Sequence, residues 1–300
     1  MGLNYGRLDA KLYGEGTAIM DGLIQDGFSF SRRRLTYESD ILDAFRGILN
    51  RSPFVTFWGV PITPPGAEMN PHTGLALGLL WCKRDKASKL AHLKESDDAF
   101  RRRRPGFPTW SWASVTGEVL NQLYGAQSIF GKYLAGRNDI SNVNDADIQF
   151  SPNSGGEWVS LDEVMQRCQS HTLPEDSVPP SLLVHGFIVR VVSAQNGLYR
   201  LYNFGQLDPP FLFAFLDLNQ DQQTVFPRKE HKYEEAVMLL DCNDDQREKP
   251  KEKKRFMLML LMWLENGTAE RRGLLGDYRL EYDSETLAKI PKFRRTFVLI

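Results

Sequence analysis

The chain has 300 residues, of which 42% are hydrophobic and 25% charged, an ordinary balance for a globular protein that buries an ample core. Its 37 Lys and Arg residues against 38 Asp and Glu residues give a formal net charge of −1, which argues against a dedicated nucleic-acid binder. Cys82, Cys168 and Cys242 lie far apart, match neither a metal site nor a disulfide framework, and favour a reducing, cytoplasmic compartment.

The first part of the chain predicts short elements. Residues 1–20 contain no apolar run of the kind that a secretory signal needs. Residues 34–50 predict a helix, because apolar side chains recur at helical spacing behind a candidate N-cap at Ser39. Residues 53–75 are rich in proline and glycine and predict a loop with short extended pieces. Residues 75–84 predict a short apolar helix or strand.

The most distinctive segment places four arginines ahead of two tryptophans that are two positions apart. We expect a strand over residues 107–119, on which Trp110 and Trp112 share one face and form an apolar plate. That plate is either part of the core, with its indole N–H groups paired, or an aromatic platform for a ligand or partner chain. The arginine run by itself is more typical of a solvated face. The candidate interaction surface consists of Arg101, Arg102, Arg103, Arg104, Trp110 and Trp112.

The composition changes between residues 136 and 181, where Asn, Asp, Ser, Gly and Pro predict an irregular insertion or linker with one short helix over residues 161–168. Strand-like patterns follow. The run at 256–264 is too short to cross a bilayer as a helix, so we expect no membrane partner, and Asn266-Gly267 predicts a tight turn. Strands are expected over residues 182–193, 198–203, 211–218, 233–241, 256–264, 268–276, 278–282 and 293–300.

These patterns together predict an α+β fold. A helix-containing segment over residues 1–135 carries the tryptophan strand, and residues 136–181 form the insertion or linker. Residues 182–300 form a β-rich domain, an antiparallel sheet or sandwich.

Motifs that carry catalysis are absent from the sequence. There is no Gly-X-Ser-X-Gly, His-Glu-X-X-His, phosphate-loop or dinucleotide-binding glycine pattern. His185 lies inside an expected strand, where a histidine that is satisfied in the core or on a sheet face is more common than a general base. We therefore expect no catalytic residue, no cofactor and no bound metal ion.

Three segments carry a family resemblance. Residues 31–49 read SRRRLTYESDILDAFRGIL, residues 57–61 and 76–81 read FWGVP and ALGLLW, and residues 107–113 read FPTWSWA. In order and spacing they resemble the SxRxLTYxSDxLNAFxGIL, FxGLP…ALLW and FPSWSW segments that follow the HET domain in fungal heterokaryon-incompatibility proteins. Residues 273–299 resemble the tail of that family more loosely.

The resemblance implies a role in fungal allorecognition and programmed cell death. The family's HET-domain blocks, YxALSYxWG, WIDxxCINQ and RxWTxQE, do not occur in this sequence, so the TIR-like signalling residues of that domain have no counterpart here. We expect a fragment, the product of a truncated gene model or a free-standing descendant of the downstream region. Its expected role is non-catalytic with a protein partner, and the sequence leaves its oligomeric state undetermined. The alternatives are a TIR-like nucleotide-cleaving enzyme, if an upstream HET domain belongs to the chain, and a degenerate remnant.

Overall fold

The fold is described from a computed structural model of the 300-residue chain. The residues that the structure describes are 31, 35–49, 55–62, 71–83, 103–117, 119–121, 143–145, 148–154, 156–167, 181–193, 198–202, 211–216, 233–244, 253–276, 282–283 and 289–300.

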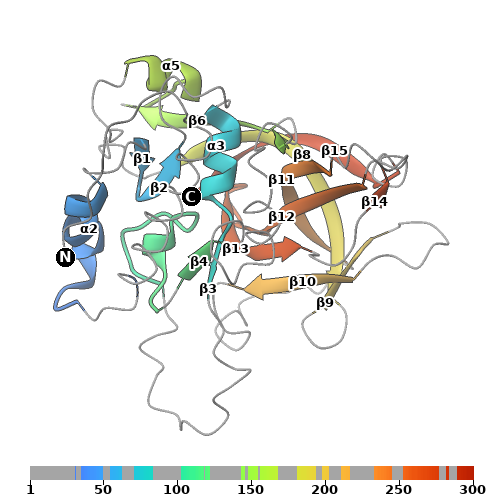
Figure 1. Ribbon diagram of the computed structural model, residues 1–300, viewed down its shortest axis with the longest axis horizontal. Helices are drawn as coiled ribbons and strands as arrows, with labels where there is room; N and C mark the ends of the chain where they lie inside the picture. The colour runs from blue at the N-terminus through green and yellow to red at the C-terminus, as the bar shows by residue number, and fades with distance from the viewer. Residues whose placement is uncertain are drawn as a thin grey trace, which may run out of the picture.

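The centre of the fold is a closed ring of six strands (Figure 1). Around the ring the order is β8, β9, β10, β13, β12 and β11, and β11 pairs with β8 again to close it. Every one of these six pairings is antiparallel. The strands are β8 (Leu182–Ser193), β9 (Leu198–Leu201), β10 (Phe211–Leu216), β11 (Glu234–Asp244), β12 (Lys253–Trp263) and β13 (Ala269–Gly276).

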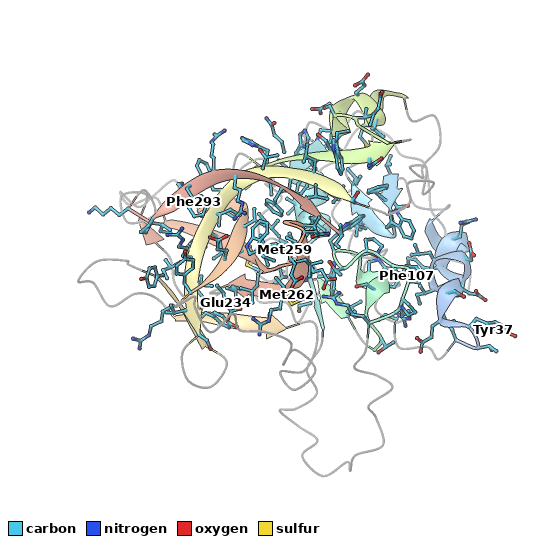
Figure 2. All side chains as sticks on the ribbon, turned by 180° about the vertical axis from the view of Figure 1, so that it is seen from behind. Tyr37, Phe107, Glu234, Met259, Met262 and Phe293 are labelled. Atoms are coloured by element: carbon cyan, nitrogen blue, oxygen red, sulfur yellow. The ribbon has the colours of Figure 1, made fainter. Side chains whose placement is uncertain are left out.

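Both faces of the ring are apolar, which explains why β12 is hydrophobic almost throughout. Successive side chains of a strand point to opposite faces. Phe256 and Leu258 belong to the smaller core cluster, inside the ring, whereas Met257 and Met259 belong to the larger cluster on its outer side. Figure 2 shows Met259 near the middle of the molecule. A strand that is covered on both faces loses the alternation of polar and apolar residues.

Strand β8 is long enough to leave the ring and join a second group of strands. Its first half pairs on one edge with β6 (Gln149–Ser154) and on the other with β15 (Lys292–Leu299). Leu299 of β15 also pairs, in parallel, with Ala269 of β13. Shorter strands extend the edges: β5 (Val143–Asp145) on β11, β7 (Glu157–Trp158) on β6 and β14 (Tyr282–Asp283) on β12.

The elements that precede β5, together with α5, extend the larger core cluster on the outer side of the ring (Figure 1). β1 and β2 form a hairpin, and β3 pairs with β4. The elements are η1 (Glu38–Asp40), α2 (Ile41–Leu49), β1 (Val55–Phe57), β2 (Val60–Ile62), α3 (Pro71–Gly78), β3 (Trp81–Lys83), η4 (Trp112–Ser114), β4 (Val119–Asn121) and α5 (Leu161–Arg167).

The expected α+β fold with a helical first part is wrong, because strands dominate the described residues. In the described residues of the first part, β1 to β4 lie alongside the short helices α2 and α3. These strands have three residues each, too few to show the alternation on which strand prediction depends. Residues 143–145, 149–154 and 157–158, expected to be irregular, form β5, β6 and β7, and β5 and β6 join the large sheet.

Several individual elements are confirmed. The strand expected over residues 182–193 is β8, and the helix expected over residues 161–168 is α5. Asn266 and Gly267 form the turn between β12 and β13, with Gly267 at a φ of +82°. Within the described residues, none of the helices has the length and apolar composition needed to cross a membrane.

Candidate functional site

The structure describes four of the six residues of the candidate interaction surface and leaves Arg101 and Arg102 outside the described residues. Trp110 is fully buried and stacks on Phe57, with 5.3 Å between ring centroids. Trp112 is 6% exposed, and its indole nitrogen donates to the carbonyl oxygen of Gly59 at 2.7 Å. The two rings therefore pack in the core and do not form an exposed plate in this structure.

The strand expected over residues 107–119 is wrong, because hydrogen bonds of Ser111 to neighbouring residues and to the distant Trp58 turn the chain instead. The hydroxyl of Ser111 accepts from the amide of Ala113 at 3.0 Å and donates to the carbonyl of Trp58 at 2.6 Å. The amide of Ser111 in turn donates to the carbonyl of Pro108. Such side-chain bonds to nearby backbone compete with sheet pairing, and they start η4 at Trp112.

The two described arginines of the run also point into the protein. Arg104 is 5% exposed, and its guanidinium group donates to the carbonyls of Ala113, at 3.0 Å, and Val115. Arg103 is half-buried and donates to the carbonyl of Thr109 at 3.2 Å. Because guanidinium donors satisfy carbonyls that an irregular loop leaves unpaired, these side chains hold the loop in shape and do not form a solvated basic face.

A third arginine, which sequence reasoning missed, connects this loop to the ring. Arg271 of β13 is fully buried and donates to the carbonyls of Leu79, at 2.5 Å, and Trp81. Its guanidinium carbon lies 3.6 Å from the ring centroid of Trp81. The carbonyl of Arg271 accepts from Arg103, and its amide donates to the hydroxyl of Thr109 at 2.9 Å. No sequence signal pointed to this role, because Arg271 lies between two other charged residues of β13, Glu270 and Arg272.

The turn of the β1–β2 hairpin, to which the side chains of Ser111 and Trp112 donate hydrogen bonds, has a strained backbone. Trp58 has a φ of +50° and Gly59 a φ of +78°, the left-handed region that only glycine adopts readily. The turn has two residues between Phe57 and Val60, and two-residue turns of type I′ need positive φ at both positions. The bonds from the Ser111 and Trp112 side chains to the two turn carbonyls hold this conformation.

We expect Gly59→Ala to destabilise the protein more than Gly106→Ala. Both glycines have positive φ, so alanine costs about 1–2 kcal/mol in backbone strain at either position. At Gly59 a methyl group would also lie 2.7 Å from Cδ2 of Leu42, whereas at Gly106 nothing lies within 4 Å, and overpacking adds about 1–3 kcal/mol. Urea denaturation of the two variants measures the difference, and equal shifts would contradict the close approach.

Two adjacent acids on β11 have arginine partners on opposite faces of the sheet. Glu234 accepts hydrogen bonds from Arg272 and, at 3.3 Å, from the hydroxyl of Tyr199. Tyr199 belongs to the smaller core cluster inside the ring. Tyr199, Glu234 and Arg272 therefore form a polar group at one end of the ring interior, where Figure 2 labels Glu234.

Burial, assisted by the negative charge of Glu234, raises the pKa of Tyr199 from 10.0 to about 12, against the opposing effect of Arg272. An unfolded tyrosine releases its proton near pH 10, whereas the folded one retains it to about pH 12. This contribution to stability is complete below pH 10 and is lost as the pH rises towards 12. We expect Tyr199→Phe to flatten the loss of unfolding free energy in that window, measured by denaturation; an unchanged slope would contradict it.

The second acid, Glu235, forms the centre of a partly exposed group that we call the Glu235 cluster. Its carboxylate lies 3.6 Å from Nε of Arg190 and 3.1 Å from a terminal guanidinium nitrogen of Arg295. The side chain of Glu235 is 12% exposed and those of the two arginines are each 42% exposed. Arg190 lies over the ring of Tyr233, at 4.3 Å, and Arg295 lies over Trp263, at 3.8 Å.

The described histidines have structural partners. His72, on α3, is buried, and its Nδ1 accepts from the amide of Phe150 at 2.9 Å. Its other ring nitrogen therefore carries the proton and donates to Asp162 at 3.2 Å. Although a histidine beside a carboxylate suggests a catalytic pair, the nitrogen that would act as a base is already bonded to the backbone. Nδ1 of His185 lies 2.8 Å from the hydroxyl of Thr296 on the neighbouring strand.

Within the part of the chain that the structure describes, no three His, Cys, Asp or Glu residues gather in a way that would hold a metal ion. Comparison with known proteins gives no match to a family model, a curated protein or a solved structure.

Proposed function

We propose that this chain is a non-catalytic regulatory or interaction region of the fungal heterokaryon-incompatibility type, acting in allorecognition and programmed cell death. The observation that supports the proposal is spatial. Buried apolar residues of the three segments that carry the sequence resemblance, 31–49, 57–61 with 76–81, and 107–113, belong to one core cluster, although residues 50–106 separate the first segment from the third.

Each of the three segments contributes an aromatic ring to one contact group. From the first, Phe45 meets Trp112 edge to face, with 5.5 Å between centroids. From the second, Phe57 stacks on Trp110, and the indole nitrogen of Trp81 donates to the carbonyl of Trp110 at 2.8 Å. Motifs that meet in this way are constrained together by packing, which is a physical reason for them to recur together in the same order.

The same contacts favour a binding role over a catalytic one. The rings of Trp110 and Trp112 are buried and pack in the core, and the hydroxyl of Ser111 donates to the turn between β1 and β2. These groups are therefore not available to a substrate. Elsewhere in the described residues, the Glu235 cluster combines charge, aromatic rings and partial exposure. A surface with arginines and aromatic rings is typical of protein interaction sites.

A cell-death assay after hyphal fusion tests the proposal. We expect a fungal strain that expresses the chain to differ in the viability of fusion cells from the same strain without it, and Trp110→Ala, which disrupts the motif core, to abolish the difference. Equal viability at equal protein level would contradict the proposal. Incubating the purified chain with NAD tests the alternative, because turnover that survives purification and depends on one acidic residue would establish an enzyme instead.

A further inference from the structure

We propose that the Glu235 cluster binds an oxyanion, a carboxylate or phosphate group, between the guanidinium groups of Arg190 and Arg295. The inference rests on geometry and charge and does not depend on the family resemblance.

The three charged residues come from three strands that meet side by side. β8 lies between β11 and β15 and supplies Arg190, while β11 supplies Glu235 and β15 supplies Arg295. Arg295 pairs across the ladder with Gly186 of β8, and Glu235 pairs with Arg190 on the other edge of β8. The side chain of Arg295 crosses β8 to reach Glu235, so the two guanidinium groups converge on one carboxylate.

The two arginines are held in place by rings rather than by a full set of acids. Arg190 lies between Tyr233 and Phe293, at 4.3 and 5.1 Å from the centroids, and Arg295 lies over Trp263. Each guanidinium group has five N–H donors, and within the described residues Glu235 is the acid that both contact. Two positive charges and one negative charge leave the cluster with an excess positive charge, and each arginine side chain is 42% exposed.

Two buried donors in the cluster lack a hydrogen-bond acceptor among the described residues. They are Nε of Arg190, which is 3.6 Å from the carboxylate of Glu235, and Nε1 of Trp263. Both atoms are donors only, so what the cluster lacks is an acceptor oxygen. A planar guanidinium fork matches the oxygens of a carboxylate or phosphate, and an oxyanion at the exposed ends of the two guanidinium groups would balance the charge.

Isothermal titration calorimetry of the whole chain with inorganic phosphate and, separately, with acetate tests the site. The reference is sodium chloride at matched ionic strength. We expect saturable binding of at least one of the two anions. Arg190→Gln and Arg295→Gln should each weaken that binding about tenfold or more, because each removes a charged hydrogen-bond donor. Arg46→Gln, at an exposed arginine of α2, is the matched control and should leave it unchanged.

Glu235→Gln distinguishes a binding site from a purely structural cluster. Removing the carboxylate that competes with the ligand for both arginines should strengthen anion binding, in the opposite direction to the arginine variants. If circular dichroism shows that the arginine variants do not fold, the anion affinity of Glu235→Gln alone tests the proposed site. Binding no stronger than that of chloride, binding retained in the Arg190→Gln, Arg295→Gln double variant, or an affinity that Glu235→Gln leaves unchanged or weakens would overturn the proposal. Preference for phosphate or acetate identifies the natural group.

Discussion

Replacing Trp110 with alanine is expected to lower the free energy of unfolding by about 3–5 kcal/mol, the range for truncating a large aromatic side chain in a core. Trp110 has no exposed surface and stacks on Phe57. Its removal therefore leaves a cavity where the β1–β2 hairpin meets residues 107–113. The cost is large relative to the total stability of about 5–15 kcal/mol that is typical of proteins. Urea denaturation followed by circular dichroism measures it.

Two further variants serve as controls. One removes the indole nitrogen of Trp110 but keeps an aromatic ring, and the other removes a tryptophan from the surface. The indole nitrogen of Trp110 is buried without an acceptor among the described residues, so Trp110→Phe, which keeps a stacked ring, should cost about 1 kcal/mol. Trp158→Ala, at a tryptophan that is 39% exposed, should change stability by about 0.5 kcal/mol or less. If Trp110→Ala shifts the denaturation midpoint no further than Trp158→Ala, Trp110 is not part of the core.

Replacing Arg271 with methionine is expected to cost on the order of 2–5 kcal/mol, although methionine fills much of the same volume. The variant leaves the carbonyls of Leu79 and Trp81 without the donors that the guanidinium group supplies. A buried acceptor that loses its partner costs about 1–3 kcal/mol. Since these carbonyls lie between α3 and β3, the loss should weaken the attachment of the first half of the chain to the ring.

Arg271→Lys tests whether the shape of the side chain matters as well as its charge. Lysine keeps the positive charge but cannot donate through a planar fork or stack on Trp81 in the same way, so we expect it to destabilise the protein too. Arg46→Ala is the reference, because the exposed pair of Arg46 with Asp43 is worth about 0.5 kcal/mol or less. A methionine variant as stable as the reference would show that the buried hydrogen bonds contribute nothing net.

The candidate site was predictable only in part, and the reason is visible in its residues. The pattern at Trp110 and Trp112 left a core position and an exposed platform both open, and it could not decide between them. The arginines at 103 and 104 looked like a solvated basic face, because composition says nothing about carbonyls that a loop will leave unpaired. The Glu235 cluster gave no sequence signal, because its members come from β8, β11, β12 and β15.

What the sequence alone determined is local. The strand over residues 182–193, the helix at 161–167 and the turn at Asn266-Gly267 follow from periodicity and turn chemistry, which depend on near neighbours. Only the tertiary structure decided the closure of the ring, the turn at Ser111 and the burial of Arg271. Each depends on hydrogen-bond partners far away in the chain: β11 for β8, Trp58 for Ser111, and Leu79 and Trp81 for Arg271.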